Sequence, residues 1–123
     1  MIRGVRGATT VTVNESSAIL EATEQLALAM IEANDIEPDA IASVIVSTTP
    51  DVTAVFPARA IRSITGWTYV PVMCTHEMDV PGAIEKCIRI MMHVNTQKGQ
   101  QDIQHIYQNE AIKLRPDLVK ERV

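Results

Sequence analysis

One apolar segment of the sequence carries a permanent charge. CIRIMMHV, residues 87–94, has the composition of a strand, yet Arg89 lies inside it. An arginine keeps its charge, so burying it without a partner is very unfavourable. Alternation along a strand places Cys87 and Met91 on the same face as Arg89. Two interpretations remain open: Arg89 points to water, as most arginines do, or an anion meets it.

Other polar residues would suit the same anion. Arginine recognises carboxylate and phosphate groups through paired hydrogen bonds, so several arginines with one carboxylate would suit a substrate bearing carboxylates and a hydroxyl. The candidates besides Arg89 are Arg3, Arg6, Arg59, Arg62, Glu77 and Tyr107. Each also has an ordinary explanation as a surface charge, a polar loop residue or a tyrosine with a wet hydroxyl.

Signatures of common catalytic sites are absent from the sequence. GxxxxGK[ST], GxGxxG, HExxH and GxSxG do not occur. CTHE, residues 74–77, is the nearest approach to a metal motif, but the other donors lack a recognised spacing, so we expect no metal. Cys74 and a histidine would make a nucleophilic pair, although an inert cysteine is the commoner case.

The composition is that of a small globular domain with an acidic balance. Of 123 residues, 46% are apolar and 21% charged, and the net charge is −4. This balance and the aromatic content of 3% argue against nucleic acid and anionic membranes as partners. No apolar run would span a bilayer, and no signal peptide is recognisable. Two cysteines make no disulfide framework, so the expected location is the cytoplasm.

Strands and helices must position these side chains. The expected strands occupy residues 2–13, 41–49, 69–74 and 87–94. Apolar residues recur at helical spacing from Ile19 to Ile31, and Asn14 has the type of a helix N-cap. A short second helix begins near Pro57 and ends near Gly66, and a helical turn and tail follow residue 100.

The sequence therefore predicts one α+β domain over residues 1–123, with a mixed sheet in the order β-α-β-α-β-β. Two helices leave much of one sheet face uncovered. Sheets of this kind often complete their core by forming oligomers.

Six stretches, taken in order, carry a family resemblance. They are IRGVRGATTV, STTPDVTAVFPARA, GWTYVPVMC, EMDVPG, KCIRIMMHV and LRPDL, and they run from residue 2 to residue 118. Together they resemble the monofunctional chorismate mutases of the trimeric α/β type, the AroH class, as distinct from the all-helical class. The ordered set is specific, although no single stretch is.

The resemblance implies an assembly and a reaction. It implies a homotrimer whose sheets pack around a central axis as a pseudo-barrel, with an active site in each cleft between subunits. The reaction rearranges chorismate to prephenate, on the route to phenylalanine and tyrosine. An ether C–O bond breaks as a C–C bond forms, and this pericyclic step needs no metal or organic cofactor.

The resemblance also implies roles for single residues. Arg89 matches the cation at the ether oxygen, where negative charge develops in the transition state. Arg6 and Tyr107 match the residues at a substrate carboxylate. Glu77 matches the acceptor of the ring hydroxyl, with Cys74 near it.

Further positions correspond to the walls and mouth of the cleft. Phe56 matches an apolar wall donated by the neighbouring subunit, and Met73 offers backbone contacts. Arg59 stands where a lysine is often found. The remaining implied substrate-binding residues are Thr75, His76, Arg62 and Arg115.

Two other functions compete with the mutase. A non-catalytic trimer that binds a small carboxylate metabolite is the first, but a mere binder has no need of Arg89 and Glu77 together. A small trimeric enamine deaminase is the second, and it would need an activated water for which no base is evident.

Overall fold

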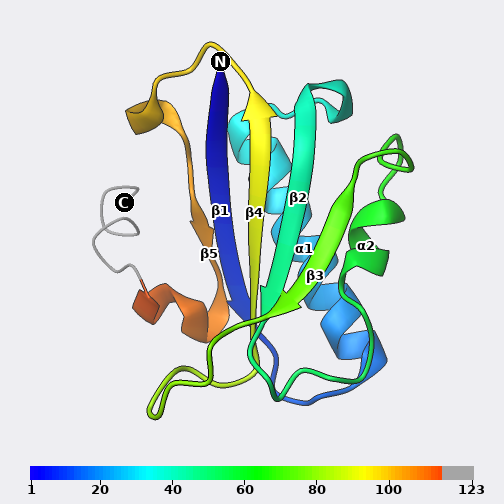
Figure 1. The fold of residues 1–123 in the computed structure, drawn as a ribbon, viewed down its shortest axis with the longest axis vertical. Helices are drawn as coiled ribbons and strands as arrows, with labels where there is room; N and C mark the ends of the chain where they lie inside the picture. Colours follow the sequence, from blue (N-terminus) through cyan, green and yellow to red (C-terminus); the bar gives the residue numbers. More distant parts are fainter. Residues whose placement is uncertain (115–123) are drawn as a thin grey trace.

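The computed structural model describes residues 1–114, which form one α+β unit (Figure 1). The strands are β1 (Ile2–Thr10), β2 (Ile41–Thr48), β3 (Val72–His76), β4 (Cys87–Asn95) and β5 (Ile106–Tyr107). The α-helices are α1 (Ser16–Asn34) and α2 (Ala58–Arg62), and 3₁₀ helices cover Pro38–Ala40, Gln100–Asp102 and Asn109–Leu114. Within residues 1–114, no helix has the length and apolar character needed to cross a bilayer.

The five strands form one mixed sheet in the order β3-β2-β4-β1-β5. The central strand β4 is antiparallel to both β1 and β2, whereas β3 runs parallel to β2 and β5 runs parallel to β1. The mixed sheet is confirmed, but the predicted count of four strands is wrong. Strand β5 has two residues, which is too short for an alternating pattern to reveal it.

Helix α1 lies behind the sheet in Figure 1 and covers one of its faces, while α2 lies beside the edge strand β3. Helix α2 contacts α1 and β3, and its Ile61 joins the core on the same face. The β4 side chains that point to this face are Ile88, Ile90, Met92 and Val94, and all are buried, as the alternation predicts. Gly7 of β1 lies beneath α1, where an added Cβ would come within 3.0 Å of Cδ1 of Leu26. The glycine therefore permits the close approach of helix and sheet.

The α-helices leave the other face of the sheet open. Arg89, Met91 and His93 of β4 lie on this open face, where Nδ1 of His93 is 3.0 Å from Oγ of Ser43 on β2. Met73 of the edge strand β3 is also on this face, since it shares a register row with Met91, and it is 64% exposed. The predicted open face is confirmed, and it carries the arginine in question.

Several predicted boundaries are wrong. Strand β1 ends at Thr10 and not at residue 13, and α2 ends at Arg62 and not near Gly66. Helix α1 begins after Glu15, and the side chain of Asn14 accepts hydrogen bonds from the backbone of Thr53 and Ala54 at 3.0 and 3.1 Å. Asn14 therefore ties down the loop after β2 and does not cap the helix. Strand β3 begins after Pro71, which has no N–H to donate, and it continues to His76.

Candidate active site

The register of the sheet places Arg89 and Tyr107 on either side of Ala8. Ala8 of β1 pairs with Arg89 of β4 on one side and with Tyr107 of β5 on the other. Its methyl group leaves space that a larger side chain would fill. A pocket of about 100 Å³ opens there, and its lining residues are Arg6, Ala8, Arg89, Tyr107 and Leu114. We call it the arginine pocket.

Glu77 meets Arg89 from the end of β3. Oε1 of Glu77 lies 3.2 Å from Nε of Arg89, with the two side chains 29% and 37% exposed. Nε itself is buried, and its N–H is not directed at the carboxylate, so it has no hydrogen-bond acceptor within residues 1–114. The contact is an ion pair that stabilises the half-buried cation at the wall of the arginine pocket.

Arg6 is fixed at both its backbone and its side chain. Its Nε–H donates to the hydroxyl of Tyr107 at 3.1 Å, and its backbone N–H donates to Nδ1 of His105 at 3.0 Å. The hydrogen bond to Tyr107 aligns the Arg6 guanidinium along the wall of the arginine pocket. Two cations thus face one small space, an arrangement that favours an anionic ligand.

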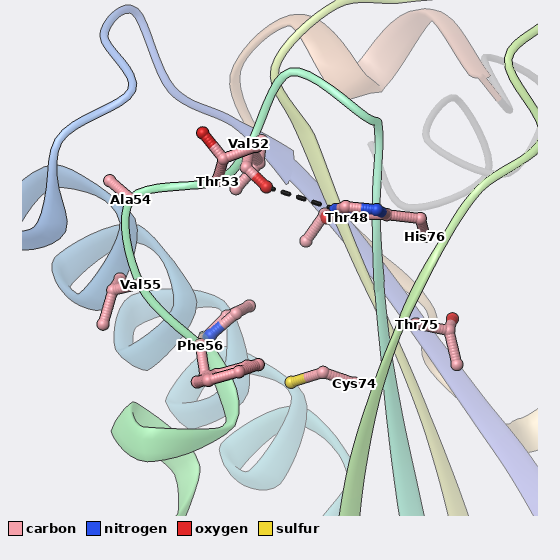
Figure 2. A pocket seen from close by; sticks show the side chains of 10 residues that line it. Thr48, Val52, Thr53, Ala54, Val55, Phe56, Cys74, Thr75 and His76 are labelled. Atoms are coloured by element: carbon pink, nitrogen blue, oxygen red, sulfur yellow. Dashed lines mark hydrogen bonds between the residues drawn. The ribbon is translucent and has the colours of Figure 1, made fainter.

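A second and larger pocket lies beside β3 (Figure 2). It measures about 600 Å³, and its lining residues are Thr48, Val52, Thr53, Ala54, Val55, Phe56, Pro57, Cys74, Thr75 and His76. Cys74 points toward Phe56 in Figure 2, and Nε2 of His76 lies 3.4 Å from the carbonyl oxygen of Val52. We call it the Phe56 pocket.

The two pockets belong to opposite sides of the sheet. Cys74 packs against the helix-covered core and shares a register row with the buried Val46, whereas Arg89 lies on the open face. The structure therefore groups Cys74 with Phe56 within one chain and does not group it with Arg89.

The remaining predicted site residues lie outside both pockets. Arg59 and Arg62 are exposed on α2, and Met73 is exposed on β3. Arg115 lies outside the described residues. Among residues 1–114, no three histidine, cysteine, aspartate or glutamate side chains are close enough together to hold a metal ion.

Sequence reasoning missed several residues of both pockets. Ala8 and Leu114 line the arginine pocket, and residues 52–55 line the Phe56 pocket. Alanine, leucine and valine carry no reactive group, so residue type gives no signal for them. Only the register of β1 with its two neighbours reveals the place of Ala8.

Fold and site together define a small single-domain α+β protein with a pocket lined by two arginines on the open face of a mixed sheet. The chain belongs to the chorismate mutase type I family, whose pattern matches residues 2–118.

Individual relatives agree with this assignment. The chain is 50% identical to the chorismate mutase AroH of Bacillus subtilis over 118 residues, which are 96% of this chain and 93% of the relative. It is 44% identical to the AroH protein of Thermus thermophilus over 119 residues, 96% and 97% of the two chains. A solved chorismate mutase from Clostridium thermocellum has a TM-score of 0.86 and 50% identity, over 89% of this chain and 96% of that chain.

Proposed function

We propose that this protein is a chorismate mutase that converts chorismate to prephenate. The half-buried guanidinium of Arg89, which lines the arginine pocket beside Glu77, is the observation that carries the proposal. As the ether bond of chorismate stretches, negative charge grows on its oxygen. A fixed cation aimed at this oxygen stabilises the transition state more than the ground state, which accelerates the reaction.

Other residues in and beside the arginine pocket hold the substrate. Arg6, aligned by Tyr107, binds a carboxylate, and Glu77 accepts a hydrogen bond from the ring hydroxyl. These contacts hold the flexible enolpyruvyl arm over the ring in its compact, reactive shape. Such positioning supplies much of the rate enhancement of an intramolecular reaction.

We further propose that the active site is shared between subunits of a homotrimer. One small molecule cannot touch both pockets of a single chain, because they lie on opposite sides of the sheet. Phe56 is 75% exposed, as a wall meant for a neighbour's substrate would be. The Phe56 pocket of one subunit, with Cys74, then closes the arginine pocket of the next.

The outer residues complete this shared cleft. Thr75 and His76 line the Phe56 pocket, and Met73 precedes them on β3 with an exposed side chain. The exposed Arg59 and Arg62 add positive charge at the mouth of the cleft. We assign the same task to Arg115. The open sheet faces pack around the axis of the trimer, which removes their exposed apolar side chains from water.

The catalytic proposal is tested by following the loss of chorismate's ultraviolet absorbance with purified protein. We expect rapid loss with the wild type and almost none with Arg89→Ala. A folded wild type that leaves chorismate unchanged would overturn the proposal. The non-catalytic carboxylate binder would then be favoured, although no feature of the site favours it now.

The shared site is tested by mixing subunits. Arg89→Ala and Phe56→Ala each damage a different pocket, so co-refolded mixed trimers regain intact sites, about a quarter of the total for random assembly. A mixture of Arg89→Ala with Arg6→Ala serves as the control, because both changes damage the same pocket. A mixture no more active than its components, or a monomeric mass of 13.5 kDa by light scattering, would contradict the shared site.

We propose the cytoplasm as the location of the protein. Both cysteines are free thiols, and Cys87 is buried, as is usual in a reducing compartment.

A further inference from the structure

The turn after β2 contacts both ends of the loop that separates Glu77 from Arg89. At the start of this loop, the backbone N–H of Glu77 donates to the carbonyl oxygen of Thr48 at 2.7 Å. At its end, the backbone N–H of Lys86 donates to both carboxylate oxygens of Asp51, at 3.1 and 2.9 Å. Residues 48–51 therefore clamp residues 77 and 86 to one another, and we call these four residues the clamp turn.

Thr49 extends the clamp into β4. Its Oγ1 accepts the backbone N–H of Cys87 at 2.9 Å, and its own backbone N–H donates to the carbonyl oxygen of Cys87 at 3.0 Å. The same hydroxyl donates to Asp51 at 2.5 Å. Thr49 is buried, so its bonds to Cys87 form away from water. These bonds to Thr49 hold the backbone of Cys87, which precedes Arg89 by two residues, in place.

Lys86 shows that this arrangement is under backbone strain. Its φ angle is +48°, in the left-handed region that residues with a side chain rarely occupy. The two hydrogen bonds from its N–H to Asp51 hold it there, and its carbonyl oxygen accepts the N–H of Val11 at 3.0 Å. A strained residue held by its surroundings is a common feature of segments that aim a functional side chain.

We propose that Thr49 and Asp51 are positioning residues, which set the Arg89–Glu77 pair by fixing the two backbone ends that carry it. Neither side chain lines the arginine pocket, so their effect passes through the backbone. The inference deepens the proposed function and rests on it for its kinetic test. A displacement of about 1 Å in a positioned catalytic group lowers a rate by up to about 100-fold.

The central experiment compares Thr49→Val with Thr49→Ser. Valine has nearly the shape of threonine but lacks the hydroxyl, whereas serine keeps it. We expect Thr49→Val to lower kcat about tenfold or more while KM changes less than about threefold, and Thr49→Ser to stay within about threefold of wild type. Equal losses in the two variants, or a folded Thr49→Val with wild-type kcat, would overturn the proposal.

A second variant covers the case in which Thr49→Val does not fold. Asp51 is exposed, so Asp51→Ala removes the clamp without opening a core cavity, and we expect the same fall in kcat. Asp79→Ala is the matched control, because it also removes one aspartate charge, and Asp79 is exposed in the 77–86 loop. A kcat for Asp51→Ala equal to that of the control would contradict the role.

A measurement without substrate separates this inference from the proposed function. The Nε–H signal of Arg89 in ¹H–¹⁵N NMR spectra, assigned by its loss in Arg89→Lys, reports the setting of the guanidinium. We expect it to shift in Thr49→Val and Asp51→Ala but not in Asp79→Ala. An unmoved signal would refute the positioning role even in an active enzyme, and a shift in a protein inert to chorismate would refute only the proposed function.

Discussion

Nε of Arg89 lies 3.2 Å from Oε1 of Glu77, and yet the N–H of this nitrogen is not directed at the carboxylate. The two side chains attract one another as charges without forming a hydrogen bond. If Glu77 fully neutralised the guanidinium, the cation would interact more weakly with a substrate. Without any ion-pair partner, a half-buried guanidinium would destabilise the fold. The geometry between these extremes keeps the cation in place at the wall of the arginine pocket.

Arg89→Lys keeps the positive charge but loses the planar fork and the Nε–H donor. We expect kcat to fall about 10²- to 10³-fold, since this is the usual effect of removing one donor that stabilises developing charge. KM should rise much less, because the interaction is strongest in the transition state. Steady-state kinetics with chorismate measure both constants.

Arg3→Lys is the matched control for that substitution. Arg3 lies on the same strand as Arg6, but its Nε–H donates to the carbonyl oxygen of Lys98 and it lines neither pocket. It should keep wild-type kinetics. A near-normal kcat in Arg89→Lys would remove Arg89 from the proposed role.

Tyr107→Phe tests the alignment of Arg6. The ring of Tyr107 is buried against Ala8 and stays in place in phenylalanine, but the acceptor of the Arg6 Nε–H is lost. A hydrogen bond to a charged group contributes about 1.5–3 kcal/mol in general, so we expect KM to rise by about 10- to 100-fold. The fall in kcat should be smaller, because a substrate carboxylate carries the same charge before and during the reaction.

Tyr69→Phe makes the same chemical change at an exposed position and should leave KM unchanged. If Tyr107→Phe lowered kcat alone, the hydroxyl would act at the reacting atoms and not on substrate binding.

The sequence predicts the central part of the sheet well and its far edge poorly. Alternation in residues 87–94 correctly separates the buried Ile88 and Ile90 from Arg89, because a nine-residue strand repeats its pattern several times. Strand β5 escapes prediction because two residues cannot show a period. Tyr107 reaches the site through this strand, so its place beside Ala8 was equally hidden.

The clamp turn shows a different limit of sequence reading. TPD was recognisable as a turn, but nothing local indicates that Asp51 would receive the N–H of Lys86, 35 positions later. The same holds for Asn14, whose type fits a helix cap but whose partners lie at residues 53 and 54. Polar side chains that bond distant backbone groups depend on the assembled fold, not on their neighbours in sequence.

The pKa of Asp51 predicts how stability varies with pH. Partial burial raises it, but the hydrogen bonds from Thr49 and Lys86 outweigh burial and hold the pKa below the usual value of 3.8. A carboxyl with a lowered folded pKa stabilises the fold above its unfolded pKa, and this stabilisation disappears as the pH falls through the folded pKa. We expect Asp51→Asn to lower the urea midpoint at pH 7 and pH 5.

The difference in urea midpoint between wild type and Asp51→Asn should shrink progressively below about pH 4, because the wild-type carboxyl takes up a proton there. Asp79→Asn, with an exposed carboxyl in the 77–86 loop, should match wild type throughout. A difference in urea midpoint that stayed constant from pH 7 to pH 3 would contradict this prediction. It would show that the charge of the Asp51 carboxylate does not contribute to stability.

The two cysteines should differ sharply in reactivity. Burial raises the pKa of the Cys87 thiol, and the nearby Arg89 offsets this only in part. Thiolates react and buried thiols do not, so native protein should lose its Cys74 thiol to a disulfide reagent first. Urea should then expose Cys87. Cys74→Ser identifies the fast thiol, since it should abolish the rapid phase and leave the slow one.

The rate of Cys74 labelling should also depend on ligand bound in the shared site. Cys74 faces Phe56 in the pocket that we assign to a neighbour's substrate, so prephenate at saturating concentration should slow its labelling (Figure 2). In the Arg89→Ala variant the same prephenate should give little protection, because the ligand no longer binds well. Protection that persisted in that variant would mean that ligand reaches Cys74 without the arginine pocket, and the two pockets would then not form one cleft.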